Sequence, residues 1–185
     1  NTSVCSLRLA RGHRVWGAND PGRPFQAPPV SSHRASKDRR GVVLEVRVQR
    51  LGTGDEDDVR RCARLMDDPP DPDAARAYLG DPRNVFFVAY EGARAVGFLR
   101  GTELGQLKSG RPQMFLYEIA VEPESRRRGI GRELIRTLVR WCRERDFEEI
   151  FVFTDDPANL AAERLYQSTG GVTETVGDRM YVYRL

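Results

Sequence analysis

The residues best suited to chemistry form a basic, glycine-containing segment between an apolar run and an amphipathic run. The segment is Arg126-Arg-Arg-Gly-Ile-Gly131, and it follows Met114–Val121, whose apolar and aromatic residues predict a buried strand. Because Gly129 and Gly131 lack a Cβ atom, the backbone can curl tightly and direct unpaired N–H groups of the following helix toward one ligand. Those donors, the helix dipole and the arginines favour a phosphate or pyrophosphate.

Spacing excludes the two best-known glycine loops. A dinucleotide-binding fingerprint needs a third glycine where Leu134 stands, and a Walker loop needs Gly-Lys-Ser/Thr, which the sequence lacks. One interpretation of Arg126–Gly131 is that it is a run of solvated arginines at an ordinary helix start. The pattern of Arg126, Gly129 and Gly131 after a strand that ends in Val121 also resembles the acetyl-CoA loop of the GNAT acetyltransferase superfamily.

Charge divides the chain of 185 residues into two parts. Residues 1–42 have a charge balance of +6 and contain four prolines, whereas residues 43–185 carry −3. We therefore expect a disordered basic N-terminal extension over 1–42 and one domain over 43–185. The extension is interpreted as an inert segment, with a targeting peptide or a segment that binds nucleic acid or acidic lipid as alternatives. No stretch is long and apolar enough for a membrane span.

Histidine and cysteine usage narrows the chemistry. Both His13 and His33 lie in the predicted extension, so the predicted domain contains no histidine. Ser-His-Asp and Cys-His catalysis both require one. Cys62 and Cys142 alone make no plausible zinc site, and we expect no metal. Any proton transfer in this domain must therefore use carboxylates, Tyr, Lys or water. The cysteines, Cys5 included, show no disulfide spacing, which favours the cytoplasm.

Hydrophobic periodicity predicts a protein of the α/β (α+β) class. Strands are expected over 44–51, 85–90, 95–103, 114–121, 150–154, 171–174 and 180–184, with helices over about 59–66, 72–79, 130–143 and from 160 to about 169. The order is strand, two helices, three strands, helix, strand, helix, two strands, and it resembles a GNAT domain over residues 43–185. The resemblance implies a mixed central sheet of about six to seven strands with about four helices.

A second segment, Asn159-Leu-Ala-Ala-Glu-Arg-Leu-Tyr-Gln-Ser-Thr-Gly-Gly171, resembles the downstream signature of the same superfamily. The resemblance implies that Asn159 binds the pantetheine arm and that Tyr166 faces the thioester sulfur. A helix cap at Asn159 and a core aromatic at Tyr166 are the alternatives. Together the two landmarks imply that acetyl-CoA contacts Ile119, Ala120, Val121, Arg126, Arg127, Arg128, Gly129, Ile130, Gly131, Arg132 and Asn159.

Within the superfamily, three segments together resemble the aminoglycoside 3-N-acetyltransferase group: Met114–Val121, Thr154-Asp-Asp-Pro-Ala-Asn and Gly170-Gly171. The resemblance implies a carboxylate at Glu118, interpreted as the general base or as an electrostatic anchor. Polycationic aminosugars need an acidic cleft, which we expect from Glu103, Asp155 and Asp156, although the two aspartates could instead cap a helix.

The resulting hypothesis is an acetyl-CoA-dependent N-acetyltransferase that acetylates a small polycationic amine, foremost an aminoglycoside at its 3-N position, by direct transfer in a ternary complex. An enzyme that acetylates peptide, protein or other small amines is the alternative, followed by a non-catalytic acyl-CoA or nucleic-acid-binding module. We expect a cationic small-molecule partner and neither nucleic acid nor membrane. The resemblance further implies a homodimer.

Overall fold

The computed structural model describes residues 5–7, 31–37, 43–66, 70–154 and 160–173 of the chain. The strands are β1 (Cys5–Leu7), β2 (Ser31–Lys37), β3 (Val43–Arg50), β4 (Asn84–Glu91), β5 (Arg94–Leu104), β6 (Gln113–Val121), β7 (Glu149–Val152) and β8 (Val172–Thr173). The helices are α1 (Glu56–Arg61), α2 (Pro72–Gly80), α3 (Ile130–Arg143) and α4 (Leu160–Gln167), with 3-10 turns η1 (Ala63–Leu65) and η2 (Pro123–Ser125). The predicted α/β class with four helices is confirmed.

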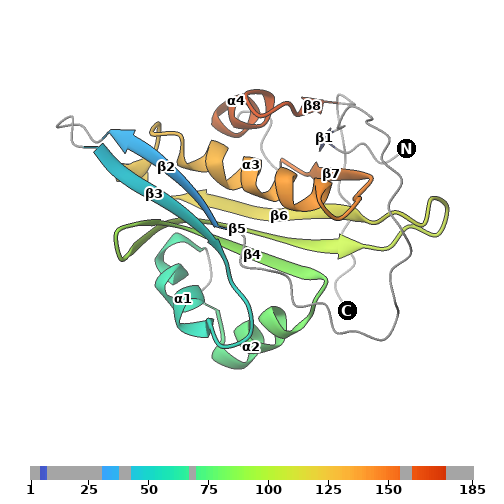
Figure 1. Ribbon diagram of the computed structural model, residues 1–185, viewed down its shortest axis with the longest axis horizontal. Helices are drawn as coiled ribbons and strands as arrows, with labels where there is room; N and C mark the ends of the chain where they lie inside the picture. Colours follow the sequence, from blue (N-terminus) through green and yellow to red (C-terminus); the bar gives the residue numbers. More distant parts are fainter. Residues whose placement is uncertain (1–4, 8–30, 38–42, 67–69, 155–159, 174–185) are drawn as a thin grey trace.

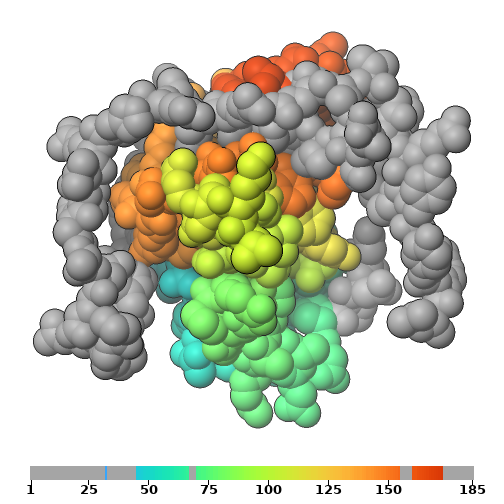
Figure 2. All heavy atoms as spheres, turned by 90° about the vertical axis from the view of Figure 1, so that its right-hand side faces the viewer, coloured from blue at the N-terminus to red at the C-terminus, as the bar shows by residue number. Residues whose placement is uncertain are grey.

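All described strands form one mixed sheet in the order β2-β3-β4-β5-β6-β7-β1-β8. The β6–β7 pair is parallel and the other pairs are antiparallel. Figure 1 shows α3 and α4 on one side of the sheet and α1 and α2 on the other. Figure 2 shows the yellow-green atoms of the β5–β6 connection at the centre of one end of the molecule.

Strand β4 is buried on both faces, which explains its nearly continuous apolar sequence. Val85 and Phe87 belong to the core that includes the buried residues of α3. Phe86 and Val88 alternate with them and pack in a second core with residues of α1 and α2. The helices on both sides of the sheet therefore each rest on a separate apolar layer.

Local sequence accounts for where the helices begin. The carboxylate of Asp71 accepts hydrogen bonds from the N–H groups of Asp73 and Ala74 at 2.9 and 3.0 Å, and Pro72 occupies the first turn of α2. Helix α3 buries one apolar stripe, including Leu134 and Leu138, against the sheet. None of the described helices is long and apolar enough to cross a membrane.

The feature that creates the site is the separation of β6 from β7. Their ladder joins Gln113–Phe115 to Glu149–Phe151, and beyond it β6 pairs only with β5 among the described strands. Opposite Arg100 the register slips so that Tyr117 is an extra residue, and such a bulge bends and twists a strand. No described strand pairs with Leu116–Val121 on its β7 side, and we call this side of the stretch the open edge of β6.

Two segments of the predicted N-terminal extension form strands of the sheet. Ser31–Lys37, predicted to be disordered, forms β2 and pairs antiparallel with β3 along its whole length, while Cys5–Leu7 forms β1 between β7 and β8. The sequence of β2 has no apolar alternation, so its structure depends on the edge that β3 offers rather than on its own pattern. The other residues of the extension and the predicted strand over 180–184 lie outside the described residues.

A buried hydrogen bond attaches β2 to α3. The hydroxyls of Ser32 and Thr137 lie 3.0 Å apart, and the two residues are 8% and 0% exposed. Thr137→Val keeps the shape but leaves the Ser32 hydroxyl buried without this partner, so we expect the free energy of unfolding to fall by about 1–3 kcal/mol. Urea denaturation of the variant and the unchanged protein measures this difference in the free energy of unfolding.

The double variant Ser32→Ala/Thr137→Val removes both polar groups, so it should lose less than the two single variants added together. Unchanged stability of Thr137→Val would contradict the packing of β2 on α3.

Candidate active site

The loop between β6 and α3 presents backbone donors to a ligand. Positive φ angles of 64° at Arg127 and 85° at Gly129 turn the chain sharply before the helix begins. The first hydrogen bond of α3 runs from Glu133 N–H to Gly129 C=O at 3.0 Å, so the N–H groups of Ile130–Arg132 precede it and have no acceptor among the described residues. The start of a 14-residue helix with such free donors favours an anion.

Glu122 fixes the start of this loop. Its carboxylate pairs with Arg94 at 2.8 Å and with Arg64 at 3.2 Å, and its side chain is only 13% exposed. The N–H group of Glu122 also donates to Val96 C=O at 2.9 Å, which ties the end of β6 to β5. The loop therefore leaves the sheet from an anchored position.

The second anchor is an ion pair between Arg128 and Glu91, the last residue of β4. The two side chains approach to 2.6 Å and are 13% and 7% exposed. Arg128 was predicted to bind the cofactor, but its guanidinium is directed at a carboxylate of the protein. Of its neighbours, Arg126 is exposed and donates through Nε to Val121 C=O at 3.0 Å, while Arg127 is exposed with no ion pair to a described residue.

The open edge of β6 and helix α4 border the loop. Ile119 and Val121 are partly buried against the α3 core, and Ala120 packs against the core on the other face. A Cβ atom at Gly131 would lie 3.2 Å from a methyl group of Leu165, so this glycine allows α4 to approach the start of α3 closely. The predicted contact residue Asn159 lies outside the described residues.

Tyr166 lies on α4 and is 6% exposed, within the core beneath α3. The structure thus places most of this side chain in apolar packing, as the alternative interpretation expected. Its helix is nevertheless the one that touches the start of α3 through Leu165.

Glu118 is held by a cross-strand arginine. Arg100 stands opposite it in the β5–β6 register, and Arg100 Nε donates to Glu118 Oε2 at 2.7 Å. The guanidinium also lies 4.4 Å from the centre of the Tyr117 ring. The side chains of Glu118 and Arg100 are 25% and 33% exposed, and Glu118 Oε1 has no hydrogen-bond partner among the described residues. One carboxylate oxygen is therefore fixed and the other remains accessible.

Glu103 lies on the opposite face of the sheet from Glu118. In the register Glu103 is opposite Met114, a residue of the α3 core, and it acts electrostatically on Cys142 of α3. Arg100, three residues earlier, has the opposite parity and faces the side of α1 and α2 together with Glu118. Because side chains alternate along a strand, Glu103 lies apart from Glu118 and does not extend the face on which Glu118 stands. Asp155 and Asp156 lie outside the described residues.

An aromatic patch that sequence reasoning missed continues the face of Glu118 across β6 and β7. Phe115 stacks on Phe151 with ring centres 5.2 Å apart and meets the edges of Tyr117 and Phe153 at 5.7 and 5.8 Å. Tyr117 and Phe153 are 60% and 40% exposed. The run of aromatics around Leu116 was a visible signal, but only the bulge at Tyr117 places that ring beside Arg100.

The described thiols and histidine lie away from this chemistry. Burial raises the pKa of the Cys62 thiol to about 12 and also raises the pKa of Cys142, so both stay protonated at neutral pH. His33 is on β2, which β3, β4 and β5 separate from β6. Within the described ranges no group of His, Cys, Asp and Glu side chains is arranged to hold a metal ion.

Comparisons with known proteins point to one family. Residues 56–170, which include the loop, α3 and α4, match the family described as acetyltransferase (GNAT) family. The chain is 36% identical to N-alpha-acetyltransferase RimI of Mycobacterium tuberculosis over 137 residues, which are 69% of this chain and 80% of that protein. It is 30% identical to N-acetyltransferase 8B of Rattus norvegicus over 98 residues, 53% of this chain and 44% of the relative, so the chain spans less than half of that relative's length.

The fold matches solved acetyltransferases. One is the crystal structure of an aminoglycoside acetyltransferase from an uncultured soil metagenomic sample in complex with sisomicin. It superposes with a TM-score of 0.68 at 28% identity, covering 75% of this chain and 97% of that chain.

The buried ion pair predicts a stability effect that an exposed pair does not. Glu91→Gln keeps the side-chain shape but removes the negative charge beside the Arg128 guanidinium. We expect the free energy of unfolding to fall by about 3 kcal/mol, the low end for breaking a buried pair, as measured by urea denaturation.

The matched control is Asp57→Asn, which breaks the pair between Asp57 and Arg60. These two side chains are 75% and 58% exposed, respectively. It should cost less than about 1 kcal/mol. If Glu91→Gln and Asp57→Asn lowered the free energy of unfolding equally, the Glu91–Arg128 pair would not anchor the loop.

Proposed function

The chain belongs to the acetyltransferase (GNAT) family, and we propose that it transfers an acetyl group from acetyl-CoA to an amino group of a small cationic molecule. Enzymes of this family use acetyl-CoA, whose thioester supplies the acetyl group. The observation that carries the proposal is the open edge of β6 beside the loop, because both present unpaired backbone groups to one elongated ligand.

The residues around the loop fit acetyl-CoA. The N–H groups of Ile130–Arg132 and the side chains of Arg126 and Arg127 suit its pyrophosphate. The pantetheine arm is an extended chain with amide groups, so Ile119–Val121 can bind it as a strand edge binds a peptide. Asn159 would add a side-chain hydrogen bond to this arm.

The open edge also supplies a donor for the reaction. A backbone N–H group within Ile119–Val121 is suited to the thioester oxygen, where it stabilises the negative charge that develops during transfer. Such a donor is fixed by the sheet, because the other side of β6 is paired with β5. It therefore needs no reorganisation when the charge appears.

Glu118 is the group we assign to the amine's proton. An amine is mostly an ammonium ion at neutral pH and cannot attack until it loses a proton. Arg100 fixes Oε2 of Glu118, while Oε1 is accessible for that proton, directly or through one water molecule. Tyr166 is the proposed proton donor to the departing thiolate, and the contact of α4 with the start of α3 supports this role.

We propose an aminoglycoside as the substrate, acetylated at the 3-N position. Support comes from the face of Glu118, where a carboxylate for the ammonium adjoins the exposed rings of Tyr117 and Phe153. Aromatic rings pack well against the apolar faces of sugar rings, and the neighbour solved with sisomicin shares 28% identity with this chain. Asp155 and Asp156 are proposed as further carboxylates for a polycationic substrate.

A second candidate is the α-amino group of a protein or peptide. The 36% identity with N-alpha-acetyltransferase RimI over most of that protein favours it. A peptide would lie extended along the face of Glu118 and present its terminal ammonium to the same oxygen.

A substrate panel separates the two candidates. Purified protein is given acetyl-CoA with aminoglycosides that possess or lack a 3-amino group and with peptides of varied N-terminal residues, and free CoA is measured. We expect rapid CoA release with the 3-amino compounds and at least about 10²-fold lower kcat/KM for compounds without that amine, because a missing polar group is rejected strongly. Faster turnover of peptides would replace the first candidate by the second.

The assignment of Glu118 predicts a specific kinetic change. Glu118→Gln retains hydrogen bonding but loses basicity, so we expect folded protein, nearly unchanged acetyl-CoA affinity and a fall in kcat of about 10²-fold or more. Glu103→Gln is the matched control, since Glu103 lies on the other face of the sheet, and its kcat should change by less than about twofold. Unchanged kcat with a raised KM in Glu118→Gln would make this residue an anchor instead of a base.

A further inference from the structure

The exposed side of α3 carries a row of arginines. Arg132, Arg136, Arg140 and Arg143 are all exposed, and their spacing of four, four and three residues places them along one side of the helix. None of them makes an ion pair with a described residue. The opposite side of α3 is buried in the core, so the helix is strongly divided between apolar packing and positive charge.

Helices α1 and α2 neutralise their exposed arginines, whereas Arg164 of α4 has no ion pair with a described residue. In α1 and α2 each exposed arginine follows an aspartate by three residues and pairs with it: Asp57 with Arg60 at 2.6 Å, Asp58 with Arg61 at 2.7 Å and Asp73 with Arg76 at 3.6 Å. Helix α3 could follow the same pattern, because Glu133 lies three residues before Arg136, yet the described residues show no ion pair between them. Helix α3 therefore differs from α1 and α2 in carrying several exposed arginines close together without a carboxylate partner among the described residues, and this concentration of positive charge favours an external anion.

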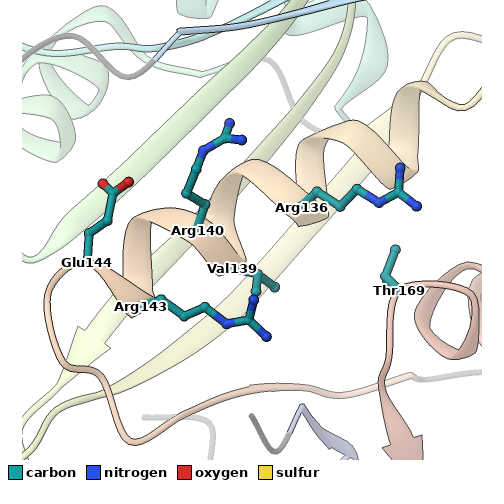
Figure 3. Close-up of a pocket in the computed structure, with 6 residues that line it drawn as sticks. All are labelled: Arg136, Val139, Arg140, Arg143, Glu144 and Thr169. Carbon is teal, nitrogen blue, oxygen red and sulfur yellow. The ribbon is translucent and has the colours of Figure 1, made fainter. Parts of the chain in front are cut away.

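Three of these arginines border a hollow. It has a volume of about 390 Å³ and is lined by Arg136, Val139, Arg140, Arg143, Glu144 and Thr169. Figure 3 shows the guanidinium groups of Arg136 and Arg143 on the side of α3 that faces Thr169, whereas Arg140 points the other way. Among the described residues of the lining, Glu144 is the one acid, and it contacts Arg145 at 3.7 Å. We call this hollow the arginine groove.

We propose that the arginine groove binds an oligophosphate, a ligand with two or more linked phosphate groups, separate from the acetyl donor. Arg136 and Arg143 are seven residues apart, which is about 10 Å along a helix axis, so an anion with several charges fits them better than a single phosphate. Each guanidinium can donate two hydrogen bonds to phosphate oxygens. The volume of the groove also lies within the usual range of small-ligand sites.

Position separates this groove from the loop that suits the donor's pyrophosphate. The loop donors are at Ile130–Arg132, whereas Arg143 is at the far end of α3, about 20 Å along the axis. One pyrophosphate cannot contact both. The proposal therefore predicts binding that persists when acetyl-CoA occupies the loop.

The test uses the full chain, saturated with acetyl-CoA, and inorganic tripolyphosphate as the probe, with heat of binding measured at low salt. We expect tripolyphosphate to bind, and Arg136→Gln/Arg143→Gln to raise its dissociation constant at least about tenfold, since hydrogen bonds to charged groups are lost. The matched control is Arg60→Gln/Arg61→Gln, which removes the same charge from exposed side chains of α1. The dissociation constant of tripolyphosphate from this control variant should change by less than about threefold.

Three results would overturn the proposal. Equal weakening in both double variants would show general attraction to a positive protein, and loss of binding when acetyl-CoA is present would assign the probe to the loop. If the groove variant weakens binding of acetyl-CoA but not of its analogue without the 3′-phosphate, the groove belongs to the donor. Failure of the proposed amine acetylation would leave the binding result unaffected, because the measurement does not require turnover.

Discussion

The structure depends on a strand that is paired on one side only. Leu116–Val121 bonds to β5 but has left β7, and unpaired backbone groups within a protein are costly unless a ligand or water satisfies them. The extra residue at Tyr117 bends β6 and so contributes to this separation. Ion pairs hold the chain on either side of the loop that follows this strand, namely the Glu122 pairs with Arg64 and Arg94 and the buried Glu91–Arg128 pair.

The two faces of the sheet at this open strand carry different groups. On the α3 side, the loop and the first turn of the helix present donors to an anion, and Gly131 lets α4 approach them. On the α1 and α2 side, the same strand carries Glu118 and the aromatic patch. Successive residues of a strand face opposite sides, so Ile119 and Val121 face the α3 core while Glu118 faces the side of α1 and α2.

Sequence patterns predicted the elements that have strong periodicity and the loop that depends on glycine. Helices α2 and α3 and strands β4 and β5 were predicted close to their observed places. Three features were not, and each depends on contacts distant in sequence. Strand β2 follows the edge of β3, Arg128 finds Glu91 across 37 residues, and Glu103 faces away from Glu118 because the bulge at Tyr117 changes the parity of β6.

Under the proposed function, the pairing of Glu118 with Arg100 bears on how a cationic substrate would be recognised. A lone carboxylate would attract any ammonium ion, but the described pair is electrically neutral as a unit. Long-range attraction on this face must therefore come from other carboxylates, and Asp155 and Asp156 follow β7 in the sequence. Near the strand, the fixed position of Glu118 and the exposed rings of Tyr117 and Phe153 select for geometry rather than charge. In the proposed reaction, such a site would discriminate between amines by where their rings place the nitrogen, which is the property that position-specific acetylation requires.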